Sequence, residues 1–285
     1  MRTCSGSAHA RAALAGNPSD GYGGAVLAVA VRDFGARVEI AEAPVLRIEP
    51  PSELVQAAVG RFAPQTRARV RWECSVPMEV GLAGSSAIVV ATLRALAAFH
   101  ERPLTVEELP EVALAVEVED LGLAAGLQDR VAQAHDTLVF MDFSGERPVY
   151  ELLDPALLPA LYLAWRSDAS EPSTVVHSDL RSRHAGNDPA ISSGMGRLAE
   201  QARAARDALV SGDRAAFAVA LDRSYDERAA MVALDPRHVA MVEAARAHGA
   251  TANCAGSGGA IVGTGSDAAW RALERQGCRV IAPRV

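Results

Sequence analysis

One segment of small residues carries the strongest chemical signal in the sequence. Residues 81–87 read Gly-Leu-Ala-Gly-Ser-Ser-Ala, between an extended segment, residues 68–76, and an apolar helical segment, residues 88–96. Small residues let the backbone approach a ligand, and the unpaired N–H groups and dipole of a helix N-terminus attract an anion. An ordinary serine-capped helix after a glycine turn is the alternative. We expect the following residues to bind phosphate: Gly81, Ala83, Gly84, Ser85, Ser86 and Ala87.

Two further glycine-bearing segments lie on either side of this one. Residues 10–24 contain Gly-Asn-Pro-Ser-Asp, and residues 253–260 read Asn-Cys-Ala-Gly-Ser-Gly-Gly-Ala. In this order the three segments resemble the substrate motif, phosphate-binding loop and C-terminal glycine loop of the GHMP kinases, a superfamily of ATP-dependent small-molecule kinases. Further matches resemble its glucuronokinase branch: residues 16–20, 84–89, 125–133, 141–143, 158–163 and 176–178.

The resemblance implies catalytic roles for two charged residues. Asp129 follows Gly-Leu-Gln and matches the aspartate proposed as the base for the substrate hydroxyl. A carboxylate can accept such a proton if burial or geometry raises its effective basicity. Arg11 matches an arginine of sugar kinases that reaches this carboxylate or the transferring phosphate, and a guanidinium stays charged. The residues alone also allow Asp129 to cap a helix and Arg11 to lie on the surface of a strand.

A Mg²⁺ site is implied by the same resemblance. The ion favours one or two carboxylates together with phosphate oxygens. Glu117 lies on the predicted helix before Asp129 and matches a metal-binding glutamate of the superfamily. Glu119 is the alternative, since two positions apart on a helix the side chains face different directions. We expect Glu117 and the hydroxyl of Ser86 to bind the ion.

The acceptor is expected to lie between the first and last glycine segments. The resemblance assigns it these residues: Asn17, Ser19, Asp20, Tyr22, His177, Gly256, Ser257 and Gly258. Asn-Pro-Ser-Asp-Gly is also well suited to a plain turn. A uronate would need a cation for its carboxylate, for which a bidentate arginine is the expected partner. The sequence leaves four candidates open for that role: Arg166, His177, Arg181 and Arg183.

Hydrophobic periodicity predicts the elements that must position these residues. Strands are expected at residues 23–31, 36–40, 68–76, 138–141 and 161–165, with a glycine-broken strand over 251–262. Helices are expected at residues 85–100, 105–122, 189–210, 213–234 and 237–248. Thr105 and Glu108 fit a capping box at the start of the second helix. Such a mixture indicates a layered α+β protein.

The resemblance makes the expected architecture more specific. It implies a GHMP kinase fold, in which an N-terminal domain like one found in a ribosomal protein precedes a ferredoxin-like C-terminal domain. The Pro-bearing, acidic segment 148–159 suggests the junction, so we expect domains at residues 1–155 and 156–285. The site is then expected in the cleft between the two domains.

Composition excludes several function classes. The chain has 285 residues, 49% hydrophobic and 22% charged, and a formal net charge of −7, which argues against nucleic-acid binding. No apolar run has the roughly 18–20 residues of a membrane span, and the N-terminus lacks a signal-peptide core, so a cytoplasmic location is the expectation. The four cysteines are far apart and lack metal-ligand spacing.

These observations predict an ATP- and Mg²⁺-dependent sugar 1-kinase, acting as a monomer or homodimer, with D-glucuronate as the preferred acceptor. Glucuronate 1-phosphate would be its product. The alternatives are a GHMP kinase for another sugar or small alcohol, of the galactose, heptose or mevalonate type, and a non-catalytic nucleotide-binding sensor, since fold does not fix function.

Overall fold

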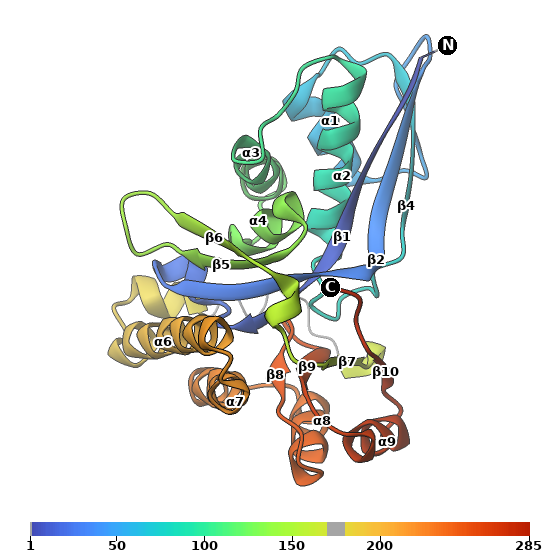
Figure 1. Cartoon of the computed structure of the whole chain (residues 1–285). Coiled ribbons are helices and arrows are strands. Elements are labelled where there is room, and N and C mark those ends of the chain that lie inside the picture. The colour runs from blue at the N-terminus through green and yellow to red at the C-terminus, as the bar shows by residue number, and fades with distance from the viewer. Residues whose placement is uncertain (1, 170–179) are drawn as a thin grey trace.

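The computed structural model describes residues 2–169 and 180–285, which form two β-sheets covered by helices (Figure 1). The larger sheet has the order β3-β4-β2-β5-β6, with β1 paired to β2. Its strands are β1 (Thr3–Ala15), β2 (Ala25–Glu42), β3 (Arg47–Glu49), β4 (Ala68–Cys74), β5 (Leu138–Asp142) and β6 (Val149–Leu153). The smaller sheet has the order β10-β7-β9-β8. Its strands are β7 (Leu161–Trp165), β8 (Asn253–Cys254), β9 (Ala260–Thr264) and β10 (Arg279–Ile281).

The antiparallel hairpin of β1 and β2 holds the larger sheet together. β2 pairs with β1 along most of its length, with β4 towards its C-terminal end and with β5 towards its N-terminal end. Separate strands at residues 23–31 and 36–40 were expected, and this was wrong. Residues 32–35, Arg-Asp-Phe-Gly, continue the strand as an irregularity in its pairing with β1, where His9 pairs with Gly35 and Ala10 with Val31.

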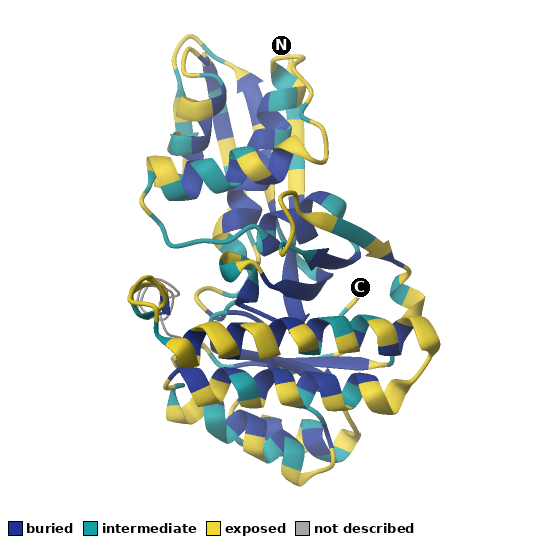
Figure 2. Ribbon diagram, turned by 90° about the vertical axis from the view of Figure 1, so that its left-hand side faces the viewer, coloured by how far each residue is buried: buried dark blue, intermediate teal, exposed yellow. Residues whose placement is uncertain are grey.

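Helix α2 is the central helix of the molecule. It is buried at nearly every position from Ser86 to Leu96 and packs against β1 and β2, as expected for a helix that is apolar all round. The other helices are α1 (Glu53–Phe62), α3 (Glu108–Ala115), α4 (Gln128–His135), α6 (Pro189–Ser211), α7 (Arg214–Met231), α8 (Pro236–Ala247) and α9 (Asp267–Arg275), and α2 itself spans Gly84–Phe99. Helices α6 and α7 pack on each other, and buried and exposed positions alternate along the helices (Figure 2).

The helix expected at residues 105–122 is shorter and ends in an irregular turn. The capping box is confirmed, because Thr105 N donates to Glu108 Oε2 at 2.9 Å and Glu108 N donates to Thr105 Oγ1 at 3.1 Å. Helix α3 then ends at Ala115, and a π-helical turn covers Val116–Asp120. Such turns often occur at functional sites, and this one carries Glu117.

The larger sheet ends at Leu153 and the smaller one begins at Leu161, so the segment between them connects the two sheets. We propose the domain division at residues 155/156 because it falls in this segment. Part of the expected junction, residues 149–153, is instead strand β6 of the larger sheet. No helix in the described residues is long and apolar enough to cross a membrane.

Candidate active site

The N-terminus of α2 faces a cavity of about 590 Å³. Ala83 precedes the helix in the left-handed conformation, with φ 61°, and the first intrahelical bond runs from Ala87 N to Ala83 O at 3.1 Å. The amides of Gly84 and Ser85 come before that bond, and both residues line the cavity. Free amides at the N-terminus of a 16-residue helix can attract an anion, which fits the phosphate site that the sequence predicts.

Two residues of the predicted phosphate loop lie differently from what we expected. The amide of Ala87 is used inside the helix, so it is not available to a phosphate. Ser86 has no exposed surface, and its hydroxyl donates to Ala83 O at 3.1 Å. The cavity is lined by Gly81, Ala83, Gly84 and Ser85. The helical phase turns residues 86 and 87 towards the protein interior.

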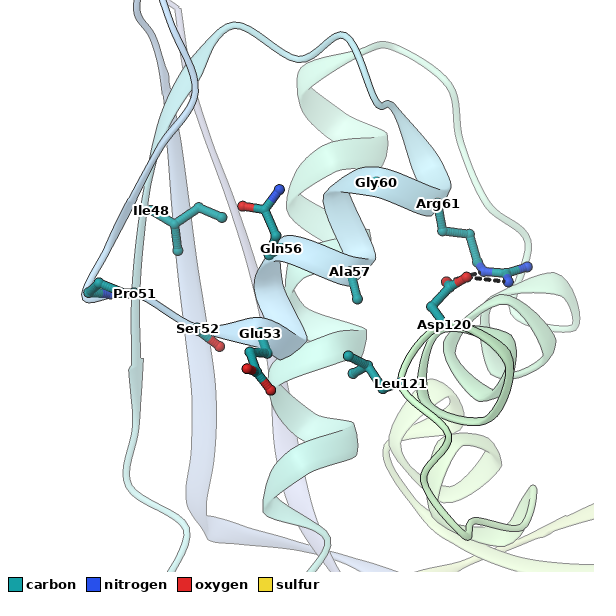
Figure 3. A pocket seen from close by; sticks show the side chains of 10 residues that line it. All are labelled: Ile48, Pro51, Ser52, Glu53, Gln56, Ala57, Gly60, Arg61, Asp120 and Leu121. Carbon is teal, nitrogen blue, oxygen red and sulfur yellow. Dashed lines mark hydrogen bonds and ion pairs between the residues drawn. The ribbon is translucent and has the colours of Figure 1, made fainter.

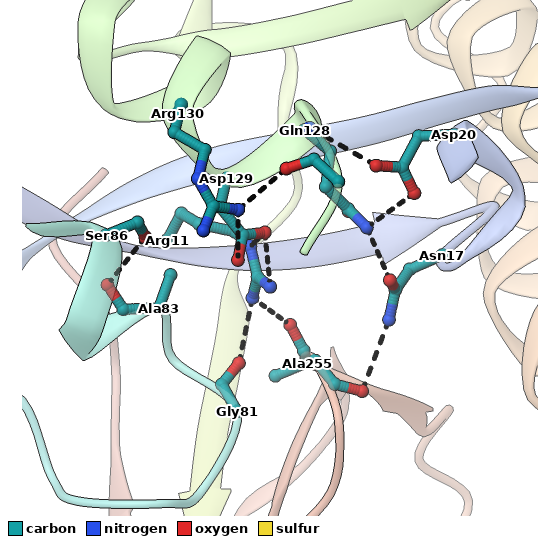
Figure 4. A network of polar contacts seen from close by, with 12 residues as sticks. Arg11, Asn17, Asp20, Gly81, Ala83, Ser86, Gln128, Asp129, Arg130 and Ala255 are labelled. Carbon is teal, nitrogen blue, oxygen red and sulfur yellow. Dashed lines mark hydrogen bonds and ion pairs between the residues drawn. The ribbon is translucent and has the colours of Figure 1, made fainter. Parts of the chain in front are cut away.

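Asp129 lies in the cavity between two arginines (Figure 4). Arg11 Nε and Nη2 both lie 2.6 Å from Asp129 Oδ1, and Arg130 Nη1 lies 3.7 Å from Oδ2. Asp129 is in the first turn of α4, whose N-cap is Leu127, so it does not cap the helix. The resemblance implied a contact of Arg11 with either this carboxylate or the transferring phosphate, and the structure contains the contact with Asp129.

Arg11 also joins three distant parts of the chain. Its Nη1 donates to Gly81 O at 2.8 Å and to Ala255 O at 2.7 Å (Figure 4). The side chain is 5% exposed, so the alternative of a surface arginine was wrong. These contacts bring the N-terminal strand, the phosphate loop and the C-terminal glycine loop around one guanidinium.

Glu117 lines the cavity and forms a buried ion pair with Arg130. The side chains of Glu117 and Arg130 are 1% and 3% exposed, and the two hydrogen bonds that the guanidinium donates to Glu117 both go to Oε2. Glu119 has a 65% exposed side chain and pairs with Arg61 at 2.8 Å. Between the two carboxylates that the sequence left open, Glu117 is therefore the one that reaches the cavity.

Another cavity, of about 1080 Å³, lies beside α1 (Figure 3). Arg61 and Asp120, which both line it, are paired at 2.5 Å. Among the described residues, none of those expected to bind phosphate or substrate lines it. We therefore place the candidate active site in the cavity that contains Asp129.

Asp20 is held in place by hydrogen bonds from the neighbouring carboxamide network, on the side of Asp129 that faces away from Arg130 (Figure 4). Gln128 Nε2 donates to Asp20 Oδ1 at 2.9 Å and also to Asn17 Oδ1, and Gln128 N donates to Asp20 Oδ2 at 3.3 Å. Asn17 Nδ2 in turn donates to Gly256 O at 3.2 Å. In the described part of the chain, the buried Oε1 of Gln128 has no hydrogen-bond partner, which makes it a candidate acceptor for a substrate hydroxyl.

Burial, and secondly the nearby charge of Asp129, raise the pKa of Asp20 from 3.8 to about 6. Because the pKa of Asp20 is higher in the folded state than in the unfolded state, the contribution of Asp20 to stability is fully present at a pH below its unfolded-state pKa. This contribution is lost as the pH rises through about 6. We therefore expect Asp20→Asn to gain stability relative to the unmodified protein by on the order of 2 kcal/mol between about pH 4 and about pH 7.

Urea unfolding of both proteins at the two pH values measures this change. Asp207→Asn, at an aspartate of α6 with a 66% exposed side chain, is the matched control. A stability difference between Asp20→Asn and the unmodified protein that stays constant across this range would contradict the prediction.

The structure brings only some of the predicted acceptor residues to the cavity. Its lining includes the following predicted residues: Asn17, Asp20, Tyr22 and Ser257. Ser19 does not contact the cavity as expected, because it is fully buried and its hydroxyl donates to Ala25 O at 2.8 Å. Gly256 takes part through its carbonyl, and Gly258 does not line the cavity. His177 lies outside the described residues.

Of the arginines that could hold a carboxylate, Arg181 lines the cavity. Its Nη2 donates to Ala125 O at 2.7 Å. Arg166 is instead paired with Asp168 at 2.7 Å, and Arg183 with Asp188 at 3.0 Å. In the two ranges that the structure describes, no group of three or more His, Cys, Asp or Glu side chains forms a metal site. A Mg²⁺ ion at this site would therefore also need oxygen atoms from a bound small molecule.

Comparison with known proteins identifies the family. Residues 53–137 match the family described as GHMP kinases N terminal domain. The chain is 32% identical over 300 residues to Glucuronokinase 1 of Arabidopsis thaliana, a match that spans 89% of this chain and 82% of that protein. The chain belongs to the GHMP kinases. This GHMP kinase is accordingly a small-molecule kinase, as the sequence predicted.

Other relatives agree with this membership. The GHMP kinase is 39% identical over 203 residues to Probable glucuronokinase 2 of Arabidopsis thaliana, covering 67% of this chain and 55% of that one. Its fold is similar to that of Lactococcus lactis galactokinase complexed with galactose, with a TM-score of 0.82, 13% identity, and 100% and 94% of the two chains covered. The predicted α+β GHMP kinase fold is confirmed.

Sequence reasoning missed two residues of the GHMP kinase site, Gln128 and Arg130. Both adjoin Asp129 in a segment that the resemblance had already marked, and both line the cavity. Their burial was the missing information, since a polar residue in the first turn of a helix is usually exposed.

Proposed function

We propose that this GHMP kinase transfers the γ-phosphoryl group of ATP to the C1 hydroxyl of D-glucuronate, giving glucuronate 1-phosphate and ADP. The supporting observation is Asp129, a carboxylate fixed by Arg11 and Arg130 in the cavity that the N-terminus of α2 also faces. The similarity to two glucuronokinases supports the choice of acceptor.

In this proposal the phosphates of ATP lie against the amides of Gly84 and Ser85. The helix dipole adds to the attraction. Arg11, whose guanidinium is fixed by two carbonyls and Asp129, lies where negative charge develops during transfer. A rigid cation stabilises that charge without having to reorganise.

Asp129 would orient the acceptor hydroxyl and take its proton. The hydroxyl oxygen forms a bond to the γ-phosphorus, the bond from this phosphorus to the bridging oxygen of ADP breaks, and the O–H proton passes to the carboxylate. Because little covalent chemistry is required, alignment by a carboxylate held at both oxygens is its main contribution.

The residues present fit a Mg²⁺ ion brought in with ATP. Contacts from Arg130 go to Glu117 Oε2, so Oε1 is the oxygen that we propose for the ion. Ser86 is buried and turned away from the cavity, so its hydroxyl would reach the ion only if it gave up its bond to Ala83 O. The ion would neutralise charge on the phosphates.

An ADP-release assay with ATP and Mg²⁺ tests the proposal across glucuronate, galacturonate, glucose, galactose and mevalonate. Glucuronate is expected to give the highest kcat/KM. Preference for a neutral sugar or for mevalonate would refute the acceptor while keeping the kinase. Tight ATP binding without turnover of any acceptor would favour a nucleotide sensor instead.

A further inference from the structure

Three arginines line the active-site cavity, and their partners differ. Arg11 is paired with Asp129, and Arg130 with Glu117. Arg181 makes no ion pair with any residue in the described ranges, and its described hydrogen bond goes to a neutral carbonyl, Ala125 O. It is therefore the cavity arginine whose charge is left for a ligand.

The position of Arg181 points to the acceptor and away from the phosphates. Ala125 is followed by Gly126, and a Cβ on Gly126 would collide with the carboxylate of Asp20. The segment that Arg181 contacts thus borders Asp20 and leads into Gln128 and Asp129. The phosphate loop approaches Asp129 separately, through Gly81 and Arg11.

The charges at this end of the cavity explain why such a cation matters. Asp129 lies close enough to Asp20 for its charge to raise the pKa of Asp20. A neutral sugar tolerates this pair, whereas an acidic sugar would be repelled by it. A guanidinium has five N–H donors in a fixed fork, so with one donor on Ala125 O it can still bind a carboxylate with two.

We propose that Arg181 binds the carboxylate of the acceptor and thereby makes the enzyme selective for acidic sugars. This inference rests on the proposed function. Arg181 is exposed and lines the cavity, so its guanidinium is accessible to an acceptor. Its hydrogen bond to Ala125 O holds the guanidinium in place before the ligand arrives, which reduces the entropy lost on binding.

Calorimetric binding of glucuronate and of its neutral amide, glucuronamide, to Arg181→Gln, Arg181→Lys and the unmodified protein tests this inference. The unmodified protein is expected to bind glucuronate at least about tenfold more tightly than the amide, because one charge-assisted hydrogen-bonded pair contributes about that factor in affinity. In Arg181→Gln this preference is expected to fall to about one, and Arg181→Lys should restore part of it.

Kinetics with glucuronate locate the effect. Arg181→Gln should raise KM for glucuronate by about tenfold to a hundredfold and leave KM for ATP unchanged. Arg166→Gln, at an arginine already paired with Asp168, is the matched control and should change neither. A rise in KM for ATP would show that Arg181 binds phosphate and would overturn the inference.

The two proposals can fail separately. If Arg181→Gln keeps the preference for glucuronate over glucuronamide, the role of Arg181 is refuted and the proposed function stands. If the unmodified protein binds glucuronate no more tightly than the amide but still phosphorylates it, the role of Arg181 alone is refuted. If it fails to phosphorylate glucuronate, both proposals are refuted.

Discussion

Replacing Asp129 with asparagine is expected to lower kcat for phosphoryl transfer by roughly 10²- to 10⁴-fold, the range for loss of a positioned general base. Asparagine keeps the shape of the side chain and can still accept a hydrogen bond from Arg11. It cannot take the proton of the acceptor hydroxyl. Because the phosphates are proposed to bind at α2, the affinity for ATP should change by less than about threefold.

Steady-state kinetics with glucuronate, together with equilibrium binding of ATP, measure both parts of this prediction. Asp136→Asn is a matched control, because Asp136 follows the other end of α4 and adopts a left-handed conformation that asparagine tolerates. Its side chain contacts His9 at 2.7 Å, outside the cavity. A kcat for Asp129→Asn within about tenfold of the unmodified value would exclude Asp129 as the base.

Arg130→Met should have the largest effect on stability. It leaves Glu117, 1% exposed, without its partner. Breaking a buried pair by removing one member typically costs about 3–5 kcal/mol, because the remaining charge stays buried and uncompensated. Arg130 also donates to Gly126 O at 2.6 Å, which adds to the loss. We expect this free-energy change in urea unfolding at neutral pH.

A double-variant cycle separates the charge effect from the loss of packing. Adding Glu117→Gln to Arg130→Met removes the unpaired charge, so the double variant should regain a large part of the lost stability. The cycle needs only the unfolding free energies of four proteins. If the losses from the two single substitutions simply add, Glu117 and Arg130 are not coupled, contrary to the geometry.

The local signals in the sequence were sufficient for several features of the site. The start of α2, the capping box at Thr105 and the long helices α6, α7 and α8 follow from short-range patterns. The resemblance supplied the pairing of Arg11 with Asp129. Strand β1 was not predicted as an element, because its alanines give little strand signal. The sequence analysis only allowed Arg11 to lie on a strand.

Other parts depended on contacts that sequence spacing does not encode. Helix α1, strand β6, helix α9 and strand β10 were missed, since their short apolar patterns become decisive only against a neighbouring element. Ser19 and Ser86 are turned inward by the packing of their own backbones, and residue type could not indicate that. The choice of Arg181 over Arg166 likewise needed the partner of each guanidinium.

The contacts of Arg11 have a consequence for how the protein is made. A chain growing on the ribosome presents its N-terminal part first, so β1 and the phosphate loop are synthesised long before Ala255. Until that residue emerges, the guanidinium lacks one of its carbonyl acceptors, and Asn253 cannot donate to Leu14 O. Nascent chains should therefore hydrolyse or transfer no phosphate, and activity should begin only once synthesis has passed the C-terminal glycine loop.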